Sequence, residues 1–150
     1  MIVHLKSTRR YYKSKTLTNF EALRYAAEHP VENEGDNPET IKALKAIRIQ
    51  LHLNSALVQL KSDHPSDAIK STNNALEIEG ISDSDKAKAY YRRGQAYGKV
   101  KEDESAIKDL KMALELNPND SGVISELNAA KNRQKMRREK EKKAYAKLFS

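Results

Sequence analysis

The sequence contains no cysteine among its 150 residues. Disulfide frameworks, thiolate zinc sites and cysteine nucleophiles are therefore excluded, and a reducing compartment such as the cytoplasm is expected. Long apolar runs are also missing, since none approaches the roughly 18 residues that a membrane-spanning helix needs. The start, MIVHLKSTRR, is too short and too charged for a secretory signal. We therefore expect a soluble cytoplasmic protein with no membrane partner.

Patterns that indicate catalysis are scarce as well. The four histidines show no paired metal-ligand spacing, and the sequence has no Gly-rich phosphate loop and no nucleophile elbow. We therefore expect no metal, no other cofactor and no catalytic residues. Hydrophobic residues make up 38% of the chain, which is enough for a core that is divided among thin, repeated layers.

The formal net charge of +7 is concentrated at the C-terminus. Residues 131–150 hold nine of the 28 Lys and Arg residues and two of the 21 Asp and Glu residues, so residues 1–130 carry 19 charges of each sign. The excess belongs to a tail, and a general phosphate-binding surface is not indicated. Between Lys131 and Lys143 there are no aromatic residues on which bases could stack. Nucleic acid is therefore not favoured as a partner.

An internal repeat occupies the second half of the chain. DAIKSTNNALEIEG, residues 67–80, and SAIKDLKMALELNP, residues 105–118, align position by position at an offset of 38 residues. A repeat of this length is typical of stacked helical units. In the second copy the apolar residues recur at helical spacing and mark one face of a helix. These residues are Ala106, Ile107, Leu110, Ala113 and Leu114.

Each copy follows another helical pattern, so the repeated unit is a pair of helices. The earlier helix is expected to begin with a cap at Asp36 or Asn37 and with Pro38 in its first turn. Its inward stripe is expected to consist of Ile41, Leu44, Ile47, Leu51 and Val58. The later helix follows Ser82–Asp85 and aligns Ala89, Tyr90, Ala96, Tyr97 and Val100. Strand patterns are absent, and an all-α fold is predicted.

A long helix is expected after Pro118, capped by Asp120 or Ser121. Its first part should cover the last helix pair, because a helical solenoid needs a terminal cap. The covering residues are Val123, Ile124, Leu127 and Ala130. From Lys131 to Lys143 apolar residues nearly vanish, so the helix is expected to project into water there.

The stretch AKAYYRRGQAYGKVKEDESAIKDLKMALELNPND, residues 87–120, resembles a complete tetratricopeptide repeat. Tyr90 stands where that motif usually has an aromatic residue, and Gly94, Tyr97, Ala106 and Pro118 follow at the expected places. The resemblance implies an all-α superhelix of helix hairpins with about three repeats, the first incomplete, and a long C-terminal capping helix. We expect a repeat domain over residues 1–130, with repeats near 5–35, 38–82 and 87–120 and a cap from 121. A basic extension follows over residues 131–150.

The same resemblance implies a carboxylate clamp, which is a set of cations and amides that binds the C-terminus of a peptide. The residues at the matching positions are Lys88, Arg92 and Asn54. Lys88 and Arg92 are four residues apart and share one helix face. Together they suit the two carboxylates of a C-terminal Asp, while Asn54 can donate to the main-chain carboxylate. The alternative is that Lys88 and Arg92 form an exposed, solvated edge.

Further peptide contacts are expected on either side of Asn54. Lys61 lies seven residues later on the same face and would meet acidic residues of the peptide, unless it is simply solvated. Leu57 would touch an apolar side chain of the peptide. The family clamp also uses a Lys and an Asn of the first repeat, and here Lys6 and Arg9 are the candidate substitute cations.

Several segments narrow the resemblance further. ALRYAAEHP, LNSALVQLK, ISDSDKAKAYYRRGQAY and REKEKKAYAKLF are together similar to the C-terminal half of the forty-kilodalton cyclophilins, over about residues 11–150. The isomerase domain of that family has no counterpart in this sequence, so no isomerase activity is expected. The resemblance implies a co-chaperone module that binds the C-terminal Met-Glu-Glu-Val-Asp peptide of the ninety-kilodalton heat-shock chaperone.

Two other interpretations stay open. The chain could be a generic repeat scaffold, or its basic tail could bind an acidic partner, calmodulin or nucleic acid. An incomplete first repeat would expose apolar helix surface, which favours self-association.

Overall fold

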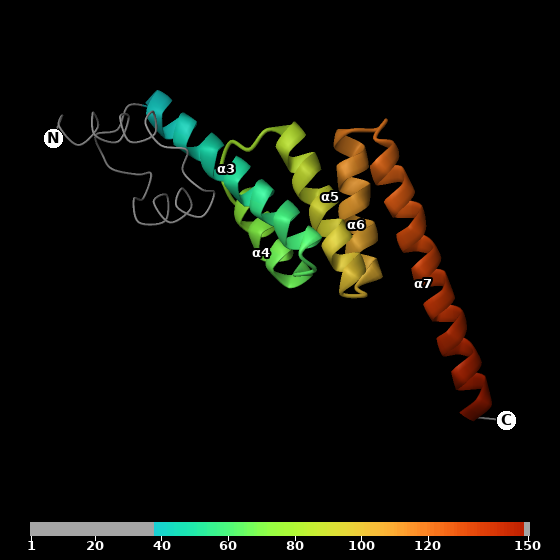
Figure 1. Ribbon diagram of the computed structural model, residues 1–150. Helices are drawn as coiled ribbons and strands as arrows, with labels where there is room; N and C mark the ends of the chain where they lie inside the picture. The colour runs from blue at the N-terminus through green and yellow to red at the C-terminus, as the bar shows by residue number, and fades with distance from the viewer. Residues whose placement is uncertain (1–37, 149–150) are drawn as a thin grey trace.

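The computed structural model describes residues 38–148, and this part of the chain is all-α, as predicted. Two helix hairpins stand side by side, and a long last helix lies along the second hairpin and continues far beyond it (Figure 1). The helices are α3 (Pro38–Lys61), α4 (Pro65–Leu76), α5 (Asp83–Lys99), α6 (Asp103–Leu116) and α7 (Ser121–Leu148). None of these described helices is both long enough and apolar enough to cross a membrane.

The starts of α3, α4, α5 and α7 follow from local sequence. Proline is the first residue of α3 and of α4, where a missing N–H costs no helical hydrogen bond. At α5 the Ser82 hydroxyl accepts a hydrogen bond from the Asp85 backbone N–H at 3.1 Å. At α7 the Asp120 carboxylate accepts from the N–H groups of Gly122 and Val123. Asp120 is therefore the cap of α7.

The two hairpin turns have the same backbone geometry. Asp63 and Lys101 both adopt positive φ, 59° and 66°, directly after the first helix of each pair. In the first turn the His64 N–H donates to the Gln59 carbonyl, and in the second the Glu102 N–H donates to Tyr97. The positive φ angle and the turn hydrogen bond each recur 38 residues later, which is the offset of the sequence repeat. The two hairpins therefore repeat each other in backbone conformation as well as in sequence.

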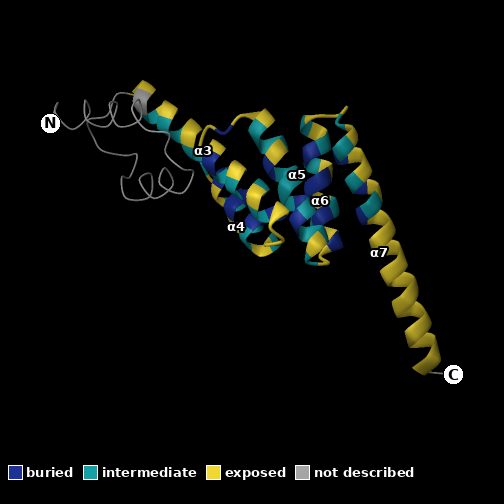
Figure 2. Ribbon diagram, viewed as in Figure 1, coloured by how far each residue is buried: buried dark blue, intermediate teal, exposed yellow. Residues whose placement is uncertain are grey.

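Within residues 38–148 the buried residues lie between the helices (Figure 2) and form three small core clusters. Many of these residues are alanine. Two clusters join α5 to the first hairpin, through Ala89 and Ala96 respectively, and the third joins α5 and α6 to α7. Small side chains let helix axes approach closely, so each layer is thin. The fully buried alanines are Ala56, Ala68, Ala75, Ala89, Ala96, Ala106, Ala113 and Ala130.

Gly94 marks the closest approach of α5 to α6. A methyl group at this position would lie 2.8 Å from Cγ of the fully buried Leu110 and 3.3 Å from the Ala106 carbonyl oxygen. Gly98, one turn later, faces α7 instead, where a methyl group would meet the guanidinium tip of Arg133 at 2.7 Å. Position 94 therefore needs glycine because the buried Leu110 leaves no room for a methyl group. At position 98 the neighbouring Arg133 side chain can move aside.

Arg93 ties three helices together. Its guanidinium donates to both carboxylate oxygens of Asp109 on α6, at 2.6 and 2.9 Å, and to the Asn73 side-chain oxygen on α4 at 2.6 Å. It also lies 5.5 Å from the ring centre of Tyr90. The hydrogen bond to Asp109, opposed by burial, raises the pKa of Arg93 above its ordinary value. Arg93 therefore contacts the partner helix, as its position about 100° from Arg92 on the helix predicts.

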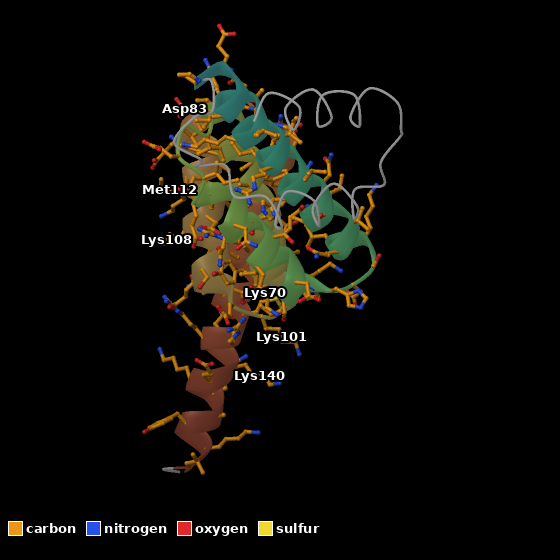
Figure 3. All side chains as sticks on the ribbon, turned by 90° about the vertical axis from the view of Figure 1, so that its left-hand side faces the viewer. Lys70, Asp83, Lys101, Lys108, Met112 and Lys140 are labelled. Carbon is orange, nitrogen blue, oxygen red and sulfur yellow. The ribbon has the colours of Figure 1, made fainter. Side chains whose placement is uncertain are left out.

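α7 is held to α6 by charge as well as by its apolar residues. The Asp103 carboxylate is buried and accepts hydrogen bonds from Arg133 and Arg137. Next to it, the exposed Glu104 pairs with Arg138 at 3.1 Å. Beyond these pairs the helix is exposed as predicted, and Lys140 lies on the part that extends away from the hairpins (Figure 3).

Some predicted inward residues point to solvent instead. Ile47 and Val58 of α3 are 42% and 56% exposed, and Ile124 of α7 is 41% exposed. The inward face of α3 is formed by other residues, because α3 packs against both α4 and α5 and needs apolar side chains in both directions. These residues are Ile49, Leu53, Ala56 and Leu60, whereas Leu51 is buried as predicted. The expected first repeat and the caps Asp36 and Asn37 lie outside the described residues.

The two glycines of α5 provide a matched test of the packing. We expect Gly94→Ala to lower the free energy of unfolding by about 1–3 kcal/mol, because the buried Leu110 has to move. Gly98→Ala should change it by less than about 1 kcal/mol, since only an Arg tip is displaced and alanine favours the helix. Urea unfolding followed by circular dichroism measures both, and equal effects would contradict this account of Gly94.

Asp103 and Glu104 provide a second matched pair. Asp103→Asn removes the charge opposite two arginines in a buried position, and we expect a loss of about 1–3 kcal/mol in the free energy of unfolding. Glu104→Gln should cost at most about 0.5 kcal/mol, because its pair with Arg138 is solvated. Hydrogen exchange of α7 amides should increase in the first variant alone. If both variants behave alike, Asp103 does not anchor α7.

Candidate peptide-binding site

The first helices of the two hairpins, α3 and α5, lie next to each other and run in the same direction. Gln50 donates to the Asp85 carboxylate at 3.0 Å near one end, and Lys99 pairs with Asp63 at 2.7 Å near the other. These partners are 35 and 36 residues apart in sequence, so the register between the helices is nearly constant. The candidate clamp residues lie between these two contacts.

Arg92 reaches across from α5 to the backbone of α3. Its guanidinium donates a hydrogen bond to the carbonyl oxygen of Leu53, the residue before Asn54. The side chain is half-buried, and burial lowers the pKa of Arg92, while the charge of Asp85 opposes that shift. Asn54 itself is exposed. The structure therefore brings the α5 cation to the part of α3 that carries the amide.

Lys88 lies one helical turn before Arg92, and half of its side chain is exposed. Its ammonium group pairs with the Asp85 carboxylate at 3.1 Å. It also borders an open cavity of about 450 Å³ between α5, α6 and α7, to which α3 contributes no residue. The cavity is lined by Ser84, Ala87, Lys88, Tyr91, Ala113, Leu116, Asn117, Asp120 and Val123.

The other candidate contacts lie further along α3. Leu57 is half-buried and Lys61 is exposed, one and two turns after Asn54. The spacing of Asn54, Leu57 and Lys61 places all three on one helix face. Lys6 and Arg9 lie outside the described residues.

The arrangement suits an anion with more than one carboxylate. The Lys88 ammonium and the Arg92 guanidinium each use a donor on a protein oxygen, and each has further N–H donors. The exposed amide of Asn54 can also donate. A guanidinium can bind a carboxylate through two parallel hydrogen bonds, whereas an ammonium acts as a point charge. Among the described residues, no group of three or more His, Asp or Glu side chains could hold a metal ion.

Sequence reasoning missed two residues at this site, Gln50 and Asp85. The pattern of Ser82 and Asp85 three residues apart is typical of a helix cap, and it could have indicated Asp85 as a capping residue. Its contacts with Lys88 and with Gln50 are not encoded in that pattern. The contact with Gln50 depends on the register between α3 and α5, which forms only in the folded protein.

Comparison with known families and proteins finds a repeat family and two relatives that cover most of the chain. The tetratricopeptide repeat family matches residues 87–120. A peptidyl-prolyl cis-trans isomerase D of Cryptococcus neoformans var. neoformans serotype D is 44% identical over 133 residues, which cover 86% of this chain and 36% of the relative. The protein of that name in Kluyveromyces lactis is 41% identical over 112 residues, which cover 75% of this chain and 30% of the relative.

The chain thus spans about a third of the length of these curated relatives. The family match coincides with the second hairpin, whose α5 carries Lys88 and Arg92. The chain contains a tetratricopeptide repeat at residues 87–120 and is similar over most of its own length to proteins named peptidyl-prolyl cis-trans isomerase D, as the predicted resemblance implies.

Proposed function

We propose that this chain is a co-chaperone module that binds the C-terminal Met-Glu-Glu-Val-Asp peptide of the ninety-kilodalton heat-shock chaperone. A tetratricopeptide repeat mediates contacts between proteins, and no catalytic set is expected from the sequence. The observation that carries the proposal is the placement of Lys88 and Arg92 one turn apart on α5, with Arg92 in contact with α3 beside Asn54.

The chemistry of a C-terminal aspartate fits these groups. Such a residue carries a main-chain and a side-chain carboxylate a few ångströms apart, which is the span of a single helical turn. Lys88 and Arg92 would each bind one carboxylate through charge-assisted hydrogen bonds, and Asn54 would donate to the main-chain carboxylate. An internal peptide segment has no main-chain carboxylate, so the site would favour a chain end.

The preceding residues of the peptide would then lie along α3. Lys61 offers a positive charge to the glutamates, and Leu57 offers an apolar contact. Lys6 and Arg9, from the N-terminal segment, are proposed as further cations that would bind the peptide. The proposed site therefore binds the C-terminal residue of the peptide through the clamp and the preceding acidic residues through Lys61.

The basic tail is the alternative acid-binding element. Part of the positive charge of the tail is used in ion pairs within the protein. Arg133 and Arg137 bind the buried Asp103, and Arg138 pairs with Glu104. A tail would attract the negative charge of a partner without distinguishing a free C-terminus from a blocked one. This difference separates the tail from the clamp in a binding experiment.

We expect the peptide Met-Glu-Glu-Val-Asp with a free C-terminus to bind with micromolar affinity. The same peptide with a C-terminal amide should bind at least about tenfold more weakly, because a charge-assisted hydrogen bond contributes roughly 1.5–3 kcal/mol. Isothermal titration calorimetry at fixed ionic strength measures both. Equal affinities would contradict the clamp and favour the tail.

We also expect Lys88→Ala and Arg92→Ala each to weaken binding of the free peptide by at least about tenfold, since each removes a charge-assisted bond. Lys86→Ala is the matched control, because Lys86 lies on the same helix and pairs with Asp83 rather than with the clamp. It should leave the affinity within about twofold of the wild type, given that a solvated pair contributes little. Comparable losses in all three variants would mean that only net charge matters.

A further inference from the structure

Asp85 is the carboxylate that already binds Lys88 in the absence of a peptide. It lies in the first turn of α5, three residues before Lys88, and its Oδ1 accepts a hydrogen bond from the ammonium group at 3.1 Å. The same oxygen accepts from Gln50 of α3 at 3.0 Å, and Oδ2 accepts from the Ser82 hydroxyl at 2.9 Å. Two local donors and one donor from α3 therefore hold this carboxylate.

The burial of Asp85 distinguishes it from a solvated surface acid. Its side chain is 17% exposed, whereas that of Lys88 is 50% exposed. Burial pushes the pKa of the Asp85 carboxyl upward, but the hydrogen bonds from Lys88, Gln50 and Ser82 outweigh it, so the pKa lies below its ordinary value. The carboxylate is therefore ionised near neutral pH.

Asp83 shows what an ordinary acid in the same turn does. It also pairs with a lysine three residues later, Lys86, at 3.2 Å. Its side chain is 75% exposed and lies at the edge of the molecule (Figure 3). Asp83 and Asp85 thus share a helix turn, a charge and the spacing of their ion pair. They differ in burial and in whether their lysine belongs to the candidate clamp.

We propose that Asp85 is a built-in competitor that limits the affinity of the clamp for carboxylate ligands. An incoming carboxylate has to share or replace Asp85 on Lys88, and it also enters the field of a fixed negative charge that reaches Arg92. Because Gln50 and Ser82 also donate to Asp85, moving this carboxylate away from Lys88 would break two further hydrogen bonds. This inference rests on the proposed function, because it concerns the same site.

Such a competitor would keep binding weak enough for rapid exchange. Removing one solvated or half-solvated charge contact changes an affinity by less than removing a clamp cation. The effect should therefore appear as a modest tightening, in the direction opposite to the loss expected from the clamp variants. The sign of the change is the feature that distinguishes a competitor from a residue that positions Lys88.

The test compares Asp85→Asn with Asp83→Asn. We expect Asp85→Asn to bind the free Met-Glu-Glu-Val-Asp peptide about two- to fivefold more tightly than the wild type. Asp83→Asn removes the same charge and should stay within about 1.5-fold. Unchanged or weaker binding by Asp85→Asn, or equal tightening by both variants, would overturn the inference. If the wild type does not bind the free peptide at all, the proposed function fails first.

A second measurement uses the wild-type protein, so that it does not depend on the stability of a variant. In a carbon-detected NMR titration with the same peptide, the side-chain carboxyl signal of Asp85 should move at saturation, because its contact with Lys88 is disturbed. The signal of Asp83 should stay in place. Peptide binding that leaves the Asp85 signal unchanged would show that Lys88 binds the ligand without involving Asp85, and the inference would be wrong.

Discussion

The close approach of α5 to its neighbours is the constraint on which the candidate site depends. Ala89 and Ala96 are fully buried against the first hairpin, and Gly94 lets the backbone of α5 come within contact distance of Leu110. The two alanines let α5 approach α3 closely and so set the distance and the register between these helices. Without that register, Arg92 could not reach the Leu53 carbonyl and Gln50 could not reach Asp85.

Two adjacent arginines have different roles because of helix geometry. Arg93 points toward α4 and α6, where Asp109 and Asn73 use its donors, and its charge stabilises the packing of the hairpins. Arg92 points toward α3, donates to a neutral carbonyl, and forms no ion pair with a carboxylate within residues 38–148. Its charge is therefore available to a ligand in a way that the charge of Arg93 is not.

The same distinction applies to the charges of α7. A count of basic residues suggests a uniform tail, yet Arg133 and Arg137 neutralise the buried Asp103 and so belong to the fold. A buried carboxylate without such partners would carry a large desolvation cost. The tail is therefore two segments, one that anchors the helix and one that is exposed beyond it.

The sequence itself determined the helical class, the repeat offset of 38 residues, the cap of α7 at Asp120 and the shared face of Lys88 and Arg92, because each depends on local spacing. Only the tertiary structure decided which face of α3 turns inward, since that helix packs in two directions and Ile47 and Val58 remain exposed. It also decided the partners of charged groups: the pairing of Asp85 with Gln50 and of Asp103 with two arginines joins residues about thirty or more positions apart. Such contacts depend on helix register and burial, which no local pattern of residues specifies.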